Sequence, residues 1–77
     1  MTSNKEYFME KQNYRITELN PDGSEELMWE GYCTKEKMKQ EFSRIIGEQQ
    51  KIRREKNTKW RQVRVYNQLG ELILVES

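Results

Sequence analysis

A run of basic and aromatic side chains in the second half of the chain has the residue types for binding an anionic polymer. Positions 51–64 hold seven Lys or Arg residues against one glutamate, Glu55. Lys and Arg neutralise phosphates, and aromatic rings stack on bases. The pattern predicts contact with nucleic acid or a nucleoprotein. The residues of this predicted surface are Lys51, Arg53, Arg54, Lys56, Lys59, Trp60, Arg61, Arg64 and Tyr66.

Two other interpretations of these residues stay open. Basic side chains at the end of a helix also complement its dipole and keep a small domain soluble. Aromatic residues, Met and Arg are enriched at protein interfaces. The alternative function is therefore a protein-binding inhibitor or adaptor, of the accessory type found in phages and mobile elements. It would dock through an open sheet face or an exposed edge strand, as a monomer or as a homodimer. The residues of this alternative protein interface are Met28, Tyr32, Trp60, Arg64 and Tyr66.

The residue inventory argues against catalysis. The chain has no histidine and one cysteine, Cys33, so a zinc site within one chain and an internal disulfide are both excluded. Cys33 precedes a predicted helix, but no histidine is present to act as its base, and we interpret it as a packing residue. Four scattered glycines form no phosphate-binding loop. We therefore expect no cofactor, no metal, no small-molecule substrate and no enzymatic activity.

Length and composition predict one small domain with a thin core. The chain has 77 residues, of which 34% are hydrophobic and 35% charged. The net charge of +1 conceals an acidic first part, residues 1–33, and a basic remainder. No apolar run has the length of a membrane span or a signal peptide, so we expect a cytoplasmic protein that does not bind membranes.

The elements that must position these side chains can be read from turns and periodicity. Strand-like segments at 12–19 and 27–33 flank Asn20-Pro21-Asp22-Gly23, which predicts a chain reversal. A second pair, 60–66 and 71–75, flanks a short loop that ends at Gly70. Residues 1–11 are predicted to be a flexible or loosely packed N-terminus, and 12–77 a single domain.

One amphipathic helix is predicted from about Lys35 to Glu55. Thr34 can cap its first turn. Gly47 lies within it, and we expect this glycine to let the helix backbone approach the sheet. The apolar stripe has helical spacing. Its members are Met38, Phe42, Ile45, Ile46, Gln49 and Ile52.

These elements predict an α+β fold of order ββαββ. We expect a four-stranded, mainly antiparallel sheet in the order 2-1-3-4, with the helix packed on one face. The residues expected beneath the helix are Leu27, Trp29, Val63 and Val65, and those expected on the opposite, open face are Met28, Tyr32, Trp60, Gln62, Arg64 and Tyr66.

The last strand is apolar on both faces, which is typical of a strand covered on both sides. We therefore expect the open face to be covered as well. The candidate covers are the N-terminal residues Tyr7, Phe8 and Met9, a second copy of the chain, or another macromolecule.

Overall fold

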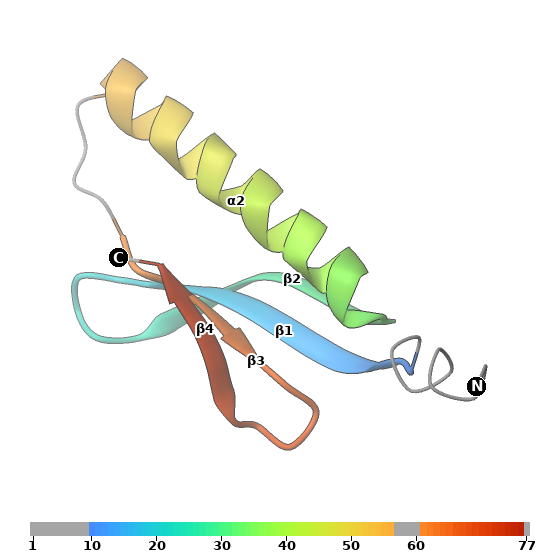
Figure 1. The fold of residues 1–77 in the computed structure, drawn as a ribbon. Coiled ribbons are helices and arrows are strands. Elements are labelled where there is room, and N and C mark those ends of the chain that lie inside the picture. The colour runs from blue at the N-terminus through green and yellow to red at the C-terminus, as the bar shows by residue number, and fades with distance from the viewer. Residues whose placement is uncertain (1–9, 57–60, 77) are drawn as a thin grey trace.

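A computed structural model, which describes residues 10–56 and 61–76, confirms the predicted ββαββ fold (Figure 1). The elements are β1 (Gln12–Leu19), β2 (Glu25–Cys33), α2 (Lys35–Lys56), β3 (Val63–Tyr66) and β4 (Leu72–Glu76). All three strand pairs are antiparallel, and the sheet order is β2-β1-β3-β4, as predicted. β2 and β4 are therefore the edge strands. The predicted Tyr7, Phe8, Met9, Lys59 and Trp60 lie outside the described residues.

Both hairpin turns form where their sequences predict them. Gly23 and Gly70 have φ of 92° and 81°, a conformation that glycine adopts without a steric penalty. The Asp22 carboxylate accepts hydrogen bonds from the Ser24 backbone N–H (2.9 Å) and hydroxyl (2.6 Å). In the second turn, the Asn67 side-chain oxygen accepts from the backbone N–H of Leu69 and Glu71. Local side-chain bonds thus stabilise both reversals.

α2 begins at the predicted cap and packs across one face of the sheet. The Thr34 hydroxyl accepts a hydrogen bond from the Lys37 N–H at 3.2 Å, which satisfies a first-turn donor. Met38 and Ile45 of α2 are buried against the sheet. The buried apolar core of the described residues is Tyr14, Ile16, Met38, Ile45, Val63 and Val65. Six side chains make a small core, as the composition predicted.

A β-bulge in β2 changes the predicted faces. Ile16 pairs with Trp29, but the next residue, Thr17, pairs with Leu27, so Met28 is an extra residue in β2. Directly opposed residues of an antiparallel pair share a face. Trp29 therefore lies beneath α2 as predicted, whereas Leu27 lies on the open face with 52% of its surface exposed. The prediction for Leu27 was wrong because simple alternation ignores the bulge.

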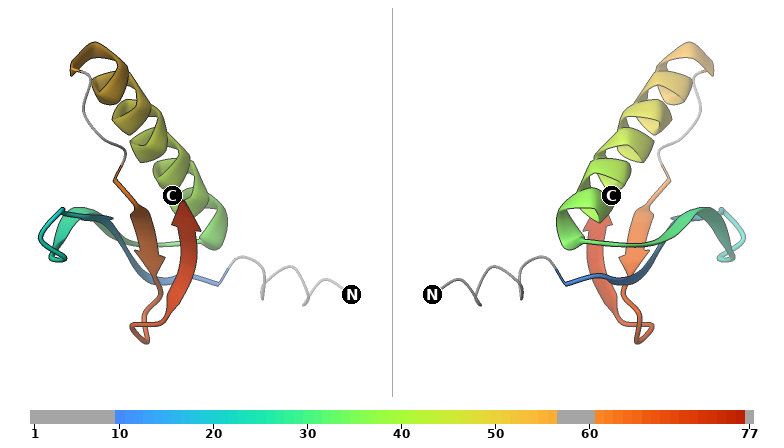
Figure 2. Two further views of the ribbon diagram at one scale, coloured as in Figure 1. Left: turned by 90° about the vertical axis from the view of Figure 1, so that its left-hand side faces the viewer. Right: turned by 90° about the vertical axis from the view of Figure 1, so that its right-hand side faces the viewer.

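The C-terminal turns of α2 extend past the sheet (Figures 1 and 2). Residues 50–56 are all exposed, and Ile52, which the apolar stripe placed against the sheet, is 50% exposed. A helix of 22 residues is about 33 Å long, more than the roughly 26 Å of an eight-residue strand. α2 also slants away from the sheet toward its C-terminal end, so its last turns have no strand beneath them (Figures 1 and 2).

Gly47 does not bring α2 close to the sheet. It is exposed, and a Cβ atom built on it would have no atom within 4 Å, apart from the nearby backbone of α2 and its sequence neighbours. The expected close approach is wrong, because Gly47 lies on the solvent side of the helix. A glycine that does lie in close contact is Gly31, where a Cβ would come within 2.7 Å of the Trp29 indole.

Candidate functional site

The candidate site is the face of the sheet opposite α2, which we call the open face. Strand register places on it side chains from all four strands. Its apolar members include Leu27 and Tyr32 on β2 and Leu72 and Val75 on β4. These four are 52%, 64%, 49% and 44% exposed, respectively. The largest apolar groups thus lie toward the two edges of this face.

A hydrogen-bonded network centred on Glu25 lies between the two apolar edges. The Glu25 carboxylate accepts a bond from the Thr17 hydroxyl and one from Arg64 Nη1, each at 2.8 Å. It also accepts from the Tyr66 hydroxyl at 2.8 Å. Glu25 and Arg64 come from strands on either side of β1, so their side chains reach over Thr17, which is only 6% exposed. The network therefore links three strands and covers the middle one.

The network lowers the pKa of its carboxylate. The hydrogen bond from the Thr17 hydroxyl, followed by those from Tyr66 and Arg64, holds the pKa of Glu25 below its ordinary value of 4.5. Glu25 is thus ionised at neutral pH and fixes the positions of Arg64 and Tyr66. The Arg15 guanidinium lies 5.6 Å from the centre of the Tyr66 ring, within the range of a cation–π contact.

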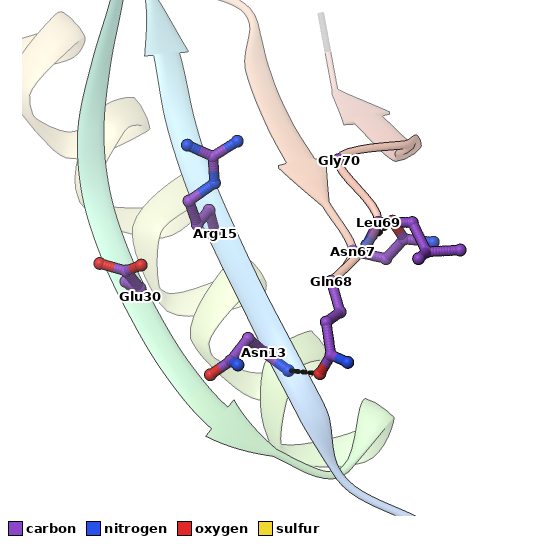
Figure 3. Close-up of a pocket in the computed structure, with 7 residues that line it drawn as sticks. All are labelled: Asn13, Arg15, Glu30, Asn67, Gln68, Leu69 and Gly70. Carbon is purple, nitrogen blue, oxygen red and sulfur yellow. Dashed lines mark hydrogen bonds between the residues drawn. The ribbon is translucent and has the colours of Figure 1, made fainter.

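A shallow hollow of about 450 Å³ opens beside this network (Figure 3). Arg15 and Glu30 line it from neighbouring strands, with the β3–β4 turn on its other side. The Asn13 N–H donates to Gln68 Oε1 at 3.1 Å, which ties the turn to β1. Figure 3 shows these side chains in front of the sheet, with α2 behind. The hollow is lined mainly by polar groups.

The residues of the predicted basic surface are divided between different parts of the molecule. Lys51, Arg53, Arg54 and Lys56 lie on the exposed end of α2. Arg61 donates to the Asn20 side chain at 3.2 Å and lies 3.9 Å from the Glu18 carboxylate. Arg64 is bound to Glu25 on the open face. Acidic groups of the first hairpin therefore partly balance the charges of Arg61 and Arg64.

Of the predicted protein interface, the structure brings Arg64 and Tyr66 together and places Tyr32 on the same face. Met28 occupies the bulge and is 40% exposed. Glu25 is the important residue that the sequence interpretation missed. Nothing local in the sequence relates Glu25 to Arg64 and Tyr66, which lie about forty positions away. Only the strand order brings these residues together.

Cys33 is the remaining residue that the sequence analysis considered. Cys33 packs against the core, and burial, reinforced by Glu41 and opposed by Lys37, raises its thiol pKa. That is the environment of a packing residue rather than of a nucleophile. Among residues 10–56 and 61–76, no group of three or more acidic or cysteine side chains could hold a metal ion. No helix in the described part of the chain combines the length and apolar character needed to cross a membrane.

Comparison of the sequence with protein-family models, of the chain with curated proteins and of the structure with solved structures found no match.

Proposed function

We propose that this protein is a non-catalytic binding module that docks on another protein through its open face. The observation that carries the proposal is the composition of this face. Exposed apolar side chains, Leu27 and Tyr32 among them, flank a network in which Glu25 holds Arg64 and Tyr66 in place. Rigid aromatic and Arg groups surrounded by apolar area are characteristic of the energetic centres of protein interfaces.

The charged side chains of the open face favour a protein partner that carries both positive and negative groups. The open face presents Arg15 and Arg64 on its inner strands and Glu25 and Glu30 on β2. A nucleic-acid backbone would meet both arginines and the glutamates that balance them. A polar protein surface with a few apolar side chains fits this distribution better.

The test compares affinity capture by the full chain with capture by two variants. Leu27→Lys places a charge on the open face, whereas Ser43→Lys adds the same charge at an exposed position of α2. We expect nuclease-treated lysate of the native host to give a protein retained by the wild type and Ser43→Lys and lost with Leu27→Lys. Retention of the same protein by all three would contradict docking through this face.

The exposed end of α2 supports a second candidate function, contact with nucleic acid. Residues 50–56 are exposed, and this end carries Lys51, Arg53, Arg54 and Lys56 against a single glutamate. Such an electrostatic contact would weaken steeply with added salt.

Charge reversal at the two ends of α2 tests this second candidate. Arg54→Glu with Lys56→Glu should abolish binding to single- and double-stranded probes, measured by fluorescence anisotropy over a salt series. Lys35→Glu with Lys39→Glu makes the same change in charge at the other end of α2 and should preserve binding. Salt-insensitive binding, or equal loss in both double variants, would contradict this function.

A further inference from the structure

We propose that two copies of this chain associate by pairing their β4 strands antiparallel, which would join two four-stranded sheets into one continuous sheet. β4 is an edge strand, so one side of its backbone has no strand partner among the described residues. Its sequence is Leu-Ile-Leu-Val-Glu, with no Pro, Lys or Arg. Leu72, Ile73 and Val75 are 49%, 38% and 44% exposed. An apolar edge of this kind is a template for adding another strand.

The opposite edge of the same sheet has features that discourage pairing. β2 carries Glu25, Glu26 and Glu30, and the bulge at Met28 interrupts its regular ladder. Charged side chains and bulges are the devices that keep edge strands from pairing with other chains. β4 has a bulge as well, because Val65 pairs with Leu74 and Tyr66 with Leu72, which leaves Ile73 as an extra residue. Charge is what distinguishes the two edges, since β4 has neither charge nor proline between Leu72 and Val75. This difference in charge indicates that β4 is the edge available for pairing.

The contrast between the edges also favours a second copy as the partner. Pairing of β4 with β2 of another copy would place apolar side chains beside three glutamates and would leave open ends for further addition. Pairing of β4 with β4 uses the same strand twice and closes on a two-fold axis. The net charge of +1 gives little repulsion between copies.

Pairing along β4 would bury side chains on both faces of the joined sheet. Val75 pairs with Arg64 and Leu72 with Tyr66, which places both apolar residues on the open face. Ile73 and Leu74 lie beside Tyr14 and Lys39, on the side of α2. Each would meet apolar groups of the second β4. This agrees with the sequence of β4, which is typical of a strand covered on both faces.

The experiment measures the mass of the full chain by sedimentation equilibrium over a concentration series. We expect the wild type to pass from the monomer mass to twice that mass, and Val75→Lys to remain monomeric. Leu27→Lys is the matched control, because it adds the same charge at a similarly exposed residue of the other edge strand. It should dimerise like the wild type.

Amide hydrogen exchange keeps the test decisive if Val75→Lys does not fold. In the wild type, protection of β4 amides should rise with protein concentration, while protection of β2 amides stays constant. A wild type that stays monomeric throughout the series would overturn the proposal and leave the β4 edge to a strand of another protein. A dimer broken by Leu27→Lys and not by Val75→Lys would also overturn it. Loss of captured protein with Leu27→Lys tests the open face separately, so the two proposals can fail independently.

Discussion

At the scale of single residues, Glu25 is the group on which the open face depends. One carboxylate accepts hydrogen bonds from Thr17, Arg64 and Tyr66, which come from two other strands. Hydrogen bonds to an ionised acceptor are stronger than neutral ones. Removing Glu25 would leave the half-buried Arg64 with its Gln62 contact and no carboxylate. The residue therefore has a structural role in addition to its place on the candidate interface.

The lowered pKa of Glu25 predicts a specific dependence of stability on pH. A carboxyl group whose folded pKa is depressed contributes stability in full above its unfolded pKa, ordinarily 4.5. That contribution is lost as pH falls through the lower folded pKa. Glu25→Gln removes the titrating group, so its free energy of unfolding should fall less than that of the wild type between neutral pH and pH values below 4.5. Urea denaturation at a series of pH values measures the difference.

Asp22 supplies the control for this pH prediction. The pKa of Asp22 is also lowered, mainly by the hydrogen bond from the Ser24 hydroxyl. Asp22→Asn should therefore also reduce the loss of unfolding free energy at low pH, independently of Glu25. Glu26 makes no side-chain hydrogen bond or ion pair with another described residue, so Glu26→Gln is the matched control for the loss of one carboxylate. Identical profiles for the wild type and Glu25→Gln would contradict the network.

At the scale of elements, the two turn glycines differ from the glycine of α2. Gly23 and Gly70 have positive φ in turns, whereas Gly47 lies in the middle of a helix with open space where a Cβ would be. Gly47 therefore has no steric requirement for glycine. Its cost to the helix relative to alanine is about 1 kcal/mol.

Substitution by alanine should have opposite effects at the two kinds of glycine. Gly47→Ala should raise the free energy of unfolding by about 0.5–1 kcal/mol, because helix propensity improves and nothing clashes. Gly23→Ala should lower it by about 1 kcal/mol or more, since alanine is strained at positive φ. Chemical denaturation of the two variants beside the wild type measures both changes. A loss of stability in Gly47→Ala would show that the helix requires glycine there.

The elements were predictable from the sequence because their signals are local. The turn residues before Gly23 and Gly70, the cap at Thr34 and the helical period of Met38 and Ile45 each act within a few positions. The strand order was also predicted correctly, from the direction of β3 relative to β2. The face on which Leu27 lies was not predicted correctly. A bulge gives no clear local signal, and it moves every side chain on one side of it to the opposite face of the sheet.

At the scale of the whole molecule, the candidate site was less predictable than the fold. The clustering of positive charge along the sequence predicted one basic surface. In the fold, the basic residues of α2 lie on its exposed end, whereas Arg61 and Arg64 lie beside Glu18 and Glu25. The Glu25 network depends on side chains that meet across β1 from distant parts of the chain. Such long-range contacts have no signature in composition or periodicity.

Association through β4 would make stability depend on protein concentration. Binding of a folded copy stabilises the folded state by mass action, so the thermal midpoint should rise as concentration rises. Val75→Lys should abolish this dependence, whereas Leu27→Lys should keep it. Scanning calorimetry at several concentrations measures the midpoints. A midpoint independent of concentration in the wild type would argue against association in the folded state.

The central position of β1 has a consequence for the speed of folding. β1 with β2, and β3 with β4, are hairpins whose strands are close in sequence. Within residues 10–56 and 61–76, the two hairpins are joined by the pairing of β1 with β3 alone. In this pairing Arg15 lies opposite Tyr66, about fifty residues away, and closing so long a loop is slow.

We expect the rate-limiting barrier of folding to be the docking of the two hairpins around α2. Ile16→Val and Val65→Ala should then slow refolding in stopped-flow experiments, whereas Leu72→Ala at the outer edge should mainly accelerate unfolding.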